Sequence, residues 1–149
     1  MSRIDTISAT DTTIQLHDAR TLGYIEYGNP AGKPLFYFHG HPVSRLEAGF
    51  LAEQAQKNNI RLIGVDRPGL GRSTYKAGRH FLDWPDDVVE LADRLHINRF
   101  AVVGFSGGGP YALACAYKIS NRLTACGVVS GVGHTGRLLS FLSTVVLQS

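Results

Sequence analysis

The chain begins with two short strand-like segments and continues with apolar runs that are separated by helical segments. Thr12–Leu16 and Leu22–Tyr27 are joined by a polar turn, a pattern that predicts an antiparallel hairpin. Uninterrupted apolar runs follow at Leu35–Phe38, Leu62–Val65, Phe100–Gly104 and Ala125–Val129. Such runs are typical of strands that are covered on both faces, as in a parallel sheet.

Segments with helical composition or periodicity lie between these runs, at residues 44–57, 84–95 and 108–120. In the second segment one apolar stripe at helical spacing is formed by Val88, Leu91, Ala92 and Leu95. The alternation of strands and helices predicts an α/β fold, with a mostly parallel sheet of about six strands and helices on both faces. No linker divides the chain, so residues 1–149 are expected to belong to one domain.

The apolar segment Leu138–Leu147 contains no charged residue. We expect it to be a helix, which either binds a partner or packs against further structure. We also expect Ala125–Val129 to form an unpaired apolar edge of the sheet, because no further parallel strand is indicated after it. An open apolar edge favours self-association of the chain.

The overall composition is that of a folded soluble domain. The 149 residues are 44% hydrophobic and 18% charged, and the net charge is +3 with His neutral. The arginines are scattered instead of forming a basic stripe with aromatic residues, so we expect no nucleic-acid partner. The N-terminus lacks the apolar core of a signal peptide, and no stretch reaches the roughly 20 apolar residues of a membrane span. The expected location is the cytoplasm.

Two cysteines and a His-x-His pair are the candidate metal ligands of the sequence. Cys115 and Cys126 lie outside any CxxC pattern and are expected to be buried as small apolar side chains. His39 and His41 would need a third ligand, which the sequence does not indicate. We therefore expect no metal and no other cofactor, and we interpret His39 as a hydrogen-bonding support for its loop.

Residues 104–108, G-F-S-G-G, match the pattern G-x-S-x-G. An apolar strand runs directly into this segment and a helix leaves directly from it, which is the setting of a nucleophile elbow. Such a turn exposes the serine hydroxyl at the carboxyl edge of the sheet, and its glycines leave room for closely approaching backbones. The start of the helix also directs N–H groups and the positive end of its dipole toward a developing oxyanion. The pattern therefore predicts Ser106 as a nucleophile.

The glycines of this segment have two other interpretations, a phosphate-binding turn and a tight structural loop. A dinucleotide fingerprint reads G-x-G-x-x-G and is followed by an acidic residue about 20 positions later. Here Ser106 occupies the place of the second glycine, and no Asp or Glu follows Asp93. Both alternatives are less favoured than the elbow.

Two further motifs follow the first two apolar runs: F-H-G-H-P at residues 38–42 and D-R-P-G-L-G-R-S at residues 66–73. With these motifs, the chain from about Thr12 to Gly133 resembles the α/β-hydrolase superfamily, in the branch with an H-G-x-P loop and a serine nucleophile. The resemblance implies an α/β-hydrolase fold. It also implies a hydrolase that acts on an ester, amide or similar bond of a small-molecule substrate, through an acyl-enzyme on Ser106.

The resemblance also assigns roles around this serine. The backbone N–H groups of His41 and Gly107 are implied to form the oxyanion hole. Asp66 is expected to hold its own loop and to take no part in catalysis. The family's dehalogenases and epoxide hydrolases have Asp at the nucleophile position, so Ser106 disfavours those reactions.

The rest of the catalytic triad is expected to be missing from this chain. A serine nucleophile needs a His base oriented by Asp or Glu, and in this fold both follow the serine along the chain. Residues 107–149 contain no acidic residue, and His134 is their single histidine. We interpret His134 as a pocket residue, with a substitute base as the alternative.

By resemblance, residues 1–149 are a truncated α/β-hydrolase domain that lacks the C-terminal strands and most of the cap. Activity is accordingly expected to be impaired or absent. The alternative function is a non-catalytic α/β-hydrolase-like binding module.

Overall fold

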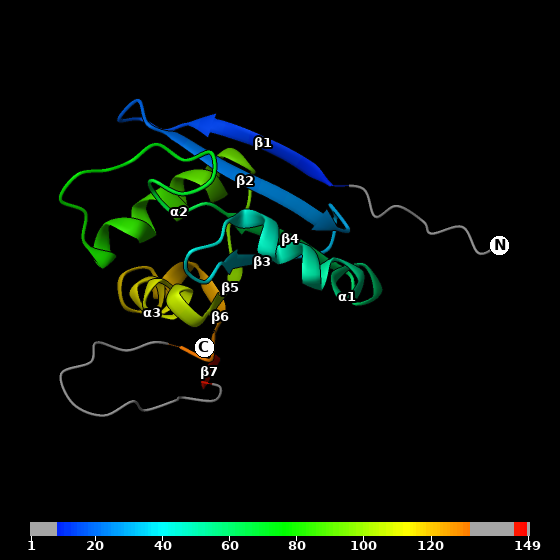
Figure 1. The fold of residues 1–149 in the computed structure, drawn as a ribbon. Helices are drawn as coiled ribbons and strands as arrows, with labels where there is room; N and C mark the ends of the chain where they lie inside the picture. Colours follow the sequence, from blue (N-terminus) through cyan, green and yellow to red (C-terminus); the bar gives the residue numbers. More distant parts are fainter. Residues whose placement is uncertain (1–8, 132–144, 149) are drawn as a thin grey trace.

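The computed structural model describes residues 9–131 and 145–148, and within these residues the chain forms one mixed sheet of seven strands (Figure 1). The strands are β1 (Thr10–Gln15), β2 (Thr21–Gly28), β3 (Lys33–Phe38), β4 (Ile60–Val65), β5 (Phe100–Phe105), β6 (Leu123–Val129) and β7 (Val145–Gln148). They lie in the order β1-β2-β4-β3-β5-β6-β7 across the sheet.

The sheet combines an antiparallel beginning with a parallel centre. β1 and β2 form the predicted hairpin, and β2 is also antiparallel to β4. β4, β3, β5 and β6 are parallel to their neighbours. The predicted fold class, a mixed sheet with an N-terminal hairpin and parallel strands, is confirmed.

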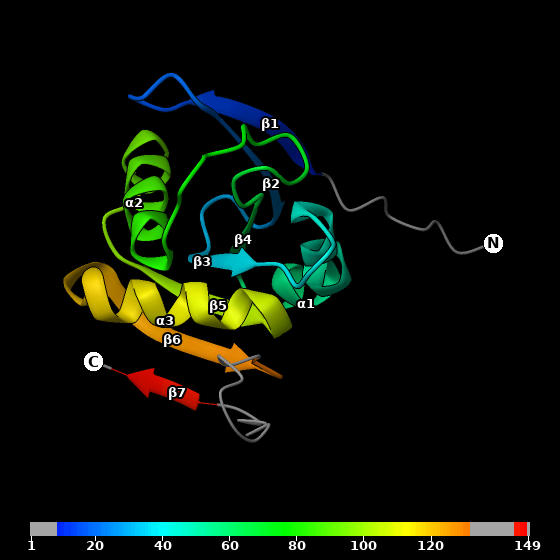
Figure 2. The same ribbon diagram turned by 60° about the vertical axis from the view of Figure 1, so that its left-hand side comes forward.

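The last strand contradicts two of the expectations. Val145–Gln148 is a strand, so a helix over Leu138–Leu147 is wrong for its final residues; residues 138–144 lie outside the described part of the chain. β7 runs antiparallel beside β6, as Figure 2 shows, and its Leu147 is opposite Cys126. The edge expected to be open at Ala125–Val129 is therefore occupied, and the predicted self-association loses that basis. The backbone N–H and C=O groups of an apolar run can form their hydrogen bonds in a strand when the edge of another strand lies beside it.

The helices match the predicted segments with one correction. α2 (Trp84–Arg94) and α3 (Gly109–Lys118) lie where they were expected. Residues 44–57 form two pieces, a 3₁₀ helix at Arg45–Leu51 and then α1 (Ala52–Lys57). Ser44 starts the first piece, because its hydroxyl accepts a hydrogen bond of 3.4 Å from the N–H of Leu46.

Helices cover both faces of the sheet, and the side chains of β3 alternate between two cores. Phe36 and Phe38 lie in the larger core with α2 and α3, where Trp84 and Val88 are also buried. Tyr37 belongs to the smaller core with α1. Within residues 9–131 and 145–148, no helix has the length and apolar character needed to cross a membrane.

Candidate active site

The loops that carry the three motifs begin side by side at one edge of the sheet. Phe38, the last residue of β3, is paired with Val65 at the end of β4 and with Gly104 in β5. The 39–42 loop, the 66–73 loop and the turn after β5 therefore leave the sheet at the same place. This carboxyl edge of the parallel strands is where open α/β sheets bind their ligands.

Ser106 lies in a tight turn between β5 and α3. A 3₁₀ turn covers Ser106–Gly108, and α3 begins at Gly109. The φ angle of Ser106 is 49°, in the left-handed region that residues other than glycine rarely adopt. Its side chain is half-buried. The predicted strand–turn–helix setting is confirmed.

Glycine is required on both sides of this serine. A Cβ atom on Gly104 would lie 2.3 Å from the carbonyl oxygen of Gly108. A Cβ atom on Gly108 would lie 2.0 Å from the carbonyl oxygen of Phe38. Both separations are far below van der Waals contact, and both partners are backbone atoms that cannot rotate away. The room that the sequence analysis ascribed to these glycines is confirmed.

The 39–42 loop packs directly against the turn. A Cβ atom on Gly40 would lie 3.5 Å from Cβ of Ser106. A Cβ atom on Gly107 would lie 3.3 Å from the backbone nitrogen of His41. The structure thus brings together Ser106, His41 and Gly107, the residues that the sequence analysis selected. Gly40 is buried, whereas the side chain of His41 is exposed.

His39 supports the loop as a neutral imidazole. Its Nδ1 lies 2.7 Å from the carbonyl oxygen of Gly40, and its Nε2 accepts a hydrogen bond of 3.3 Å from the N–H of Arg67. An Nε2 that accepts leaves the proton on Nδ1, which then donates to Gly40. Burial, together with the charge of Arg67, lowers the pKa of His39 to about 4. The interpretation of His39 as a hydrogen-bonding support is confirmed.

Glu47 holds the same loop through its backbone amide. Its Oε2 accepts one hydrogen bond of 2.9 Å from the N–H of Gly40 and another of 2.9 Å from the hydroxyl of Tyr37. Burial and this hydrogen bond raise the pKa of Tyr37 above its ordinary value. Nothing in the local sequence marks Glu47 for this role, because a glutamate in a helical segment ordinarily faces solvent.

Arg67 lies between the 39–42 loop and α3 and is 2% exposed. Its guanidinium donates to the carbonyl oxygen of His39, and its Nη2 donates to that of Gly40 at 3.1 Å. It also lies over the ring of Tyr111 in α3, 4.7 Å from the ring centroid. Burial lowers the pKa of the guanidinium. The role of Arg67 is not visible in the sequence, because the carbonyl groups it binds are 28 and 27 positions away along the chain.

Asp66 organises the 66–73 loop and is fully buried. Its carboxylate accepts hydrogen bonds from the backbone N–H of Arg45 at 2.7 Å and from that of Arg72 at 2.8 Å. The Arg45 guanidinium adds a further bond of 2.9 Å, and the hydroxyl of Ser73 donates to the Asp66 carbonyl oxygen at 2.8 Å. The predicted structural role of Asp66 is confirmed, and Arg45 is a partner that the sequence did not reveal.

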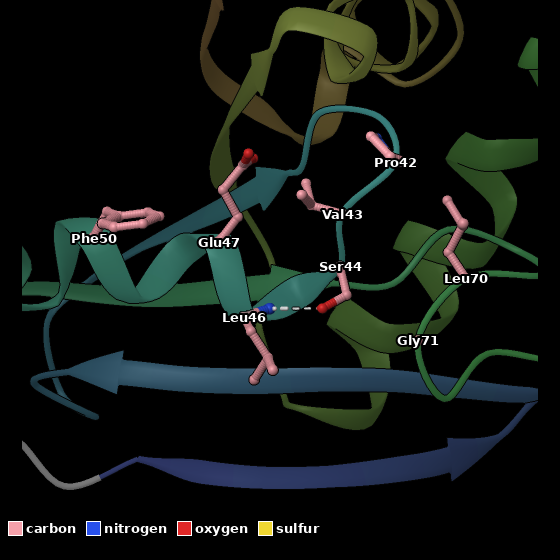
Figure 3. A pocket seen from close by; sticks show the side chains of 8 residues that line it. All are labelled: Pro42, Val43, Ser44, Leu46, Glu47, Phe50, Leu70 and Gly71. Atoms are coloured by element: carbon pink, nitrogen blue, oxygen red, sulfur yellow. Dashed lines mark hydrogen bonds between the residues drawn. The ribbon is translucent and has the colours of Figure 1, made fainter.

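A groove of about 500 Å³ opens beside the 39–42 loop (Figure 3). It is lined by Pro42, Val43, Ser44, Leu46, Glu47, Phe50, Leu70 and Gly71. Its walls include the exposed apolar side chains of Val43, Leu46 and Phe50. Figure 3 shows that the side chains of Leu46 and Glu47 point in opposite directions. Pro42 of the 39–42 loop lines the groove, whereas Ser106 does not.

Metal-ligating residues are not gathered in the described part of the chain. Among residues 9–131 and 145–148, no group of three or more His, Cys, Asp or Glu side chains could hold a metal ion. Cys115 and Cys126 are free and buried, as predicted, and burial raises the pKa of both thiols. His134, the predicted pocket residue, lies outside the described residues.

Known proteins resemble this chain in sequence and in fold. A sequence profile of the alpha/beta hydrolase family matches residues 32–148. Proline iminopeptidase from Xylella fastidiosa is 34% identical over 110 residues, which cover 72% of this chain and 35% of that protein. Non-heme chloroperoxidase from Streptomyces lividans is 29% identical over 122 residues, which cover 80% and 44%. A thermophilic esterase from Thermogutta terrifontis superposes with a TM-score of 0.67 at 26% identity, covering 77% of this chain and 43% of that structure.

The chain thus spans less than half the length of each of these proteins. The stretch matched by the family profile includes the 39–42 loop, the 66–73 loop and the turn around Ser106. A family match over most of the chain, together with the mixed sheet and the common origin of these loops at one sheet edge, shows that this chain belongs to the α/β-hydrolase family.

Proposed function

We propose that Ser106 is the nucleophile of a serine hydrolase site that cleaves an ester, amide or similar bond through an acyl-enzyme. The serine oxygen gives up its proton to a base and attacks the substrate carbonyl carbon, and the backbone N–H groups of His41 and Gly107 stabilise the resulting oxyanion. The intermediate then expels the alcohol or amine, which takes up a proton, and water hydrolyses the acyl-enzyme to release the acid and free Ser106. The observation that supports this most directly is the contact between the 39–42 loop and the turn, which sets the His41 nitrogen beside Gly107 and Gly40 beside Ser106.

The similar proteins support a small-molecule substrate without fixing its identity. One is a proline iminopeptidase, one a non-heme chloroperoxidase and one an esterase. These names cover different reactions, so we propose only the general class of a carbonyl substrate. The groove beside the 39–42 loop is suited to an apolar substituent, because Val43, Leu46 and Phe50 expose carbon surface in it.

The 149 residues by themselves are proposed to have impaired activity. No Asp or Glu follows Ser106, and His134 is the single histidine after it, so this segment offers at most one residue for the base. Oxyanion stabilisation and binding alone leave roughly 10³- to 10⁴-fold acceleration over water in related machinery. Turnover of activated esters should therefore lie far below that of an intact serine hydrolase.

Labelling with a fluorophosphonate tests the proposal, because this probe bonds covalently to an activated serine hydroxyl. We expect slow labelling that mass spectrometry locates at Ser106 and that is absent in Ser106→Ala. An intact serine hydrolase, run in parallel, should be labelled far faster. Fast labelling that is lost in His134→Ala would show that His134 acts as the base and that this chain is catalytically competent.

The second candidate function is a non-catalytic binding module. It is favoured by the absence of acidic residues from residues 107–149. Under this alternative the fluorophosphonate should label Ser106 no faster than it labels an exposed serine in the urea-unfolded chain. That result would contradict the nucleophile assignment.

A further inference from the structure

The peptide unit between Gly40 and His41 is held at its carbonyl oxygen. This oxygen accepts a hydrogen bond of 3.1 Å from Nη2 of Arg67 and lies 2.7 Å from Nδ1 of His39. The preceding carbonyl, that of His39, also accepts from the Arg67 guanidinium. One planar group thus binds two consecutive carbonyl oxygens of the loop. The fork of N–H groups on an arginine can do this, whereas the single ammonium group of a lysine cannot do it with the same geometry.

Fixing a carbonyl oxygen also fixes the N–H group of the same peptide unit. Among the described residues the single cis peptide bond is His41–Pro42, so the bond between Gly40 and His41 is trans. In a trans peptide the C=O and N–H bonds lie in one plane and point in opposite directions. Because the carbonyl oxygen is turned toward Arg67, the His41 N–H is turned away from it. The backbone nitrogen concerned is the one that lies beside Gly107.

The same guanidinium reaches the other side of the site. It lies 4.7 Å from the ring centroid of Tyr111, which belongs to the first turn of α3, the helix that follows the turn around Ser106. The Tyr111 hydroxyl accepts a hydrogen bond of 2.7 Å from Arg79, and the Arg79 guanidinium lies 5.7 Å from the ring centroid. Arg67 therefore connects the 39–42 loop to the helix that follows the turn.

Burying this charge is costly, because the desolvation that lowers the pKa of Arg67 outweighs the attraction of the Glu47 carboxylate. In the part of the chain that the structure describes, the Nε of Arg67 is buried without a hydrogen-bond partner. A buried guanidinium whose partners are carbonyl oxygens and an aromatic face is poorly compensated for lost hydration. An arginine buried under these conditions is better explained by the groups it orients than by a contribution to stability.

We propose that Arg67 is a positioning residue for the oxyanion hole, which orients the His41 N–H toward the carbonyl oxygen of a substrate bonded to Ser106. The inference rests on the proposed function. Arg67 does not touch the reacting atoms; it acts through the peptide unit between Gly40 and His41 and through the packing of that loop on α3.

Fluorophosphonate labelling kinetics of the full chain provide the first test, with Arg67→Met, Arg67→Lys and the control Arg61→Met. Arg61 is also paired through its guanidinium, with Glu26, but it lies at the start of β4, away from the loops. We expect the bond-forming rate constant to fall roughly tenfold to hundredfold in Arg67→Met, since loss of one oxyanion donor costs about 10²- to 10³-fold in related sites. The reversible binding constant of the probe should change little, and Arg67→Lys should recover part of the rate.

The second test reports the loop directly and does not need a reactive serine. Residual dipolar couplings of the His41 N–H, measured against those of β4 and β5 amides, give the orientation of this bond relative to the sheet. We expect the coupling to change in Arg67→Met and to stay at the wild-type value in Arg61→Met. Thermal unfolding of each variant establishes that the fold is retained.

The two tests separate failure of this inference from failure of the proposed function. If wild-type Ser106 is not labelled, the hydrolase proposal fails, and the dipolar couplings alone decide whether Arg67 orients His41. If wild-type Ser106 is labelled and Arg67→Met reacts at the same rate, the role of Arg67 is wrong while the nucleophile assignment stands. An unchanged His41 coupling in Arg67→Met overturns the inference in either case.

Discussion

The two sides of the candidate site are held in place by different kinds of interaction. The turn around Ser106 is fixed by backbone sterics, because two glycines have no space for a side chain and the serine has a positive φ. The 39–42 loop is fixed by side chains, since His39, Glu47 and Arg67 bind its amide and carbonyl groups. One side therefore depends on the lack of side chains at two glycines, and the other depends on hydrogen bonds from side chains to the loop backbone.

This difference predicts how each side responds to change. A steric constraint is local, independent of pH and nearly all-or-none, because a clash with backbone cannot be relieved by rotating a side chain. Hydrogen bonds from side chains weaken by degrees and respond to protonation. Substitutions in the turn should accordingly disrupt the fold, whereas substitutions around the 39–42 loop should give graded and titratable effects.

The largest effect is expected for Gly108→Ala. The new Cβ would lie 2.0 Å from the carbonyl oxygen of Phe38, so β3 and the turn must separate. We expect the free energy of unfolding to fall by about 4 kcal/mol or more, measured by urea denaturation followed by circular dichroism. Gly127→Ala is the matched control, because its Cβ would meet Val103 at an ordinary 3.5 Å. Wild-type stability in Gly108→Ala would show that backbone sterics do not fix the turn around Ser106.

The next largest effect is expected at the base of the 66–73 loop. Asp66→Asn removes the charge opposite the buried Arg45 guanidinium and replaces one acceptor oxygen by a donor that faces other donors. Breaking a buried pair of this kind costs about 3 kcal/mol of unfolding free energy. Asp11→Asn is the control, because Asp11 binds the same arginine from an exposed position and should cost less than about 1 kcal/mol. Equal losses in the two variants would show that burial of Asp66 has no special weight.

The local side of the site could be predicted from the sequence, since its signal lies within five consecutive residues. The G-x-S-x-G pattern, the apolar strand before it and the helix after it specify the turn around Ser106 without long-range information. The parallel strands were predictable for a similar reason, because their continuous apolar runs mark burial on both faces. The shared edge that joins the three loops follows from the register of those strands.

The distant contributions could not be predicted, because their residues look ordinary in sequence. Glu47 lies in a helical segment and Arg67 in a loop, where exposed charges are the rule, and their roles depend on pairing in space. The strand Val145–Gln148 was missed for a related reason. Short apolar runs fit a strand or a buried helix equally well, and here the free edge of β6 decides between them.

The titratable character of the loop side predicts a pH dependence carried by His39. Its pKa is about 4 in the folded protein and about 6.5 when unfolded, so the unfolded chain binds more protons between these values. Stability from neutral His39 is fully present above pH 6.5, is lost as the pH falls toward 4, and changes no further below 4. The total loss should approach about 3 kcal/mol.

The measurement is the free energy of unfolding from urea denaturation at pH 7.0, 5.5 and 4.5, in the wild type and in His39→Asn. Asparagine keeps a donor for the Gly40 carbonyl and does not titrate, so the difference between the two proteins isolates His39. We expect the wild type to lose its advantage over the variant as the pH falls. A difference that stays constant with pH would mean that His39 is not held neutral by the fold.

The smallest effect is expected for Glu47→Gln, and it tests whether the 39–42 loop depends on charge as well as on hydrogen-bonding shape. Glutamine keeps a carbonyl oxygen that can accept from Gly40, but this bond is no longer assisted by a negative charge, so we expect a cost of about 1 kcal/mol. Amide hydrogen exchange at Gly40 should accelerate about fivefold, which corresponds to that free energy.

Tyr37→Phe is the control, because it removes the other partner of Glu47 and leaves the bond to Gly40 in place. Faster Gly40 exchange in Glu47→Gln alone would show that the Glu47 carboxylate stabilises the loop directly. Equal acceleration in both variants would instead show that Glu47 acts through the packing around β3, and the loop side of the site would then rest on His39 and Arg67.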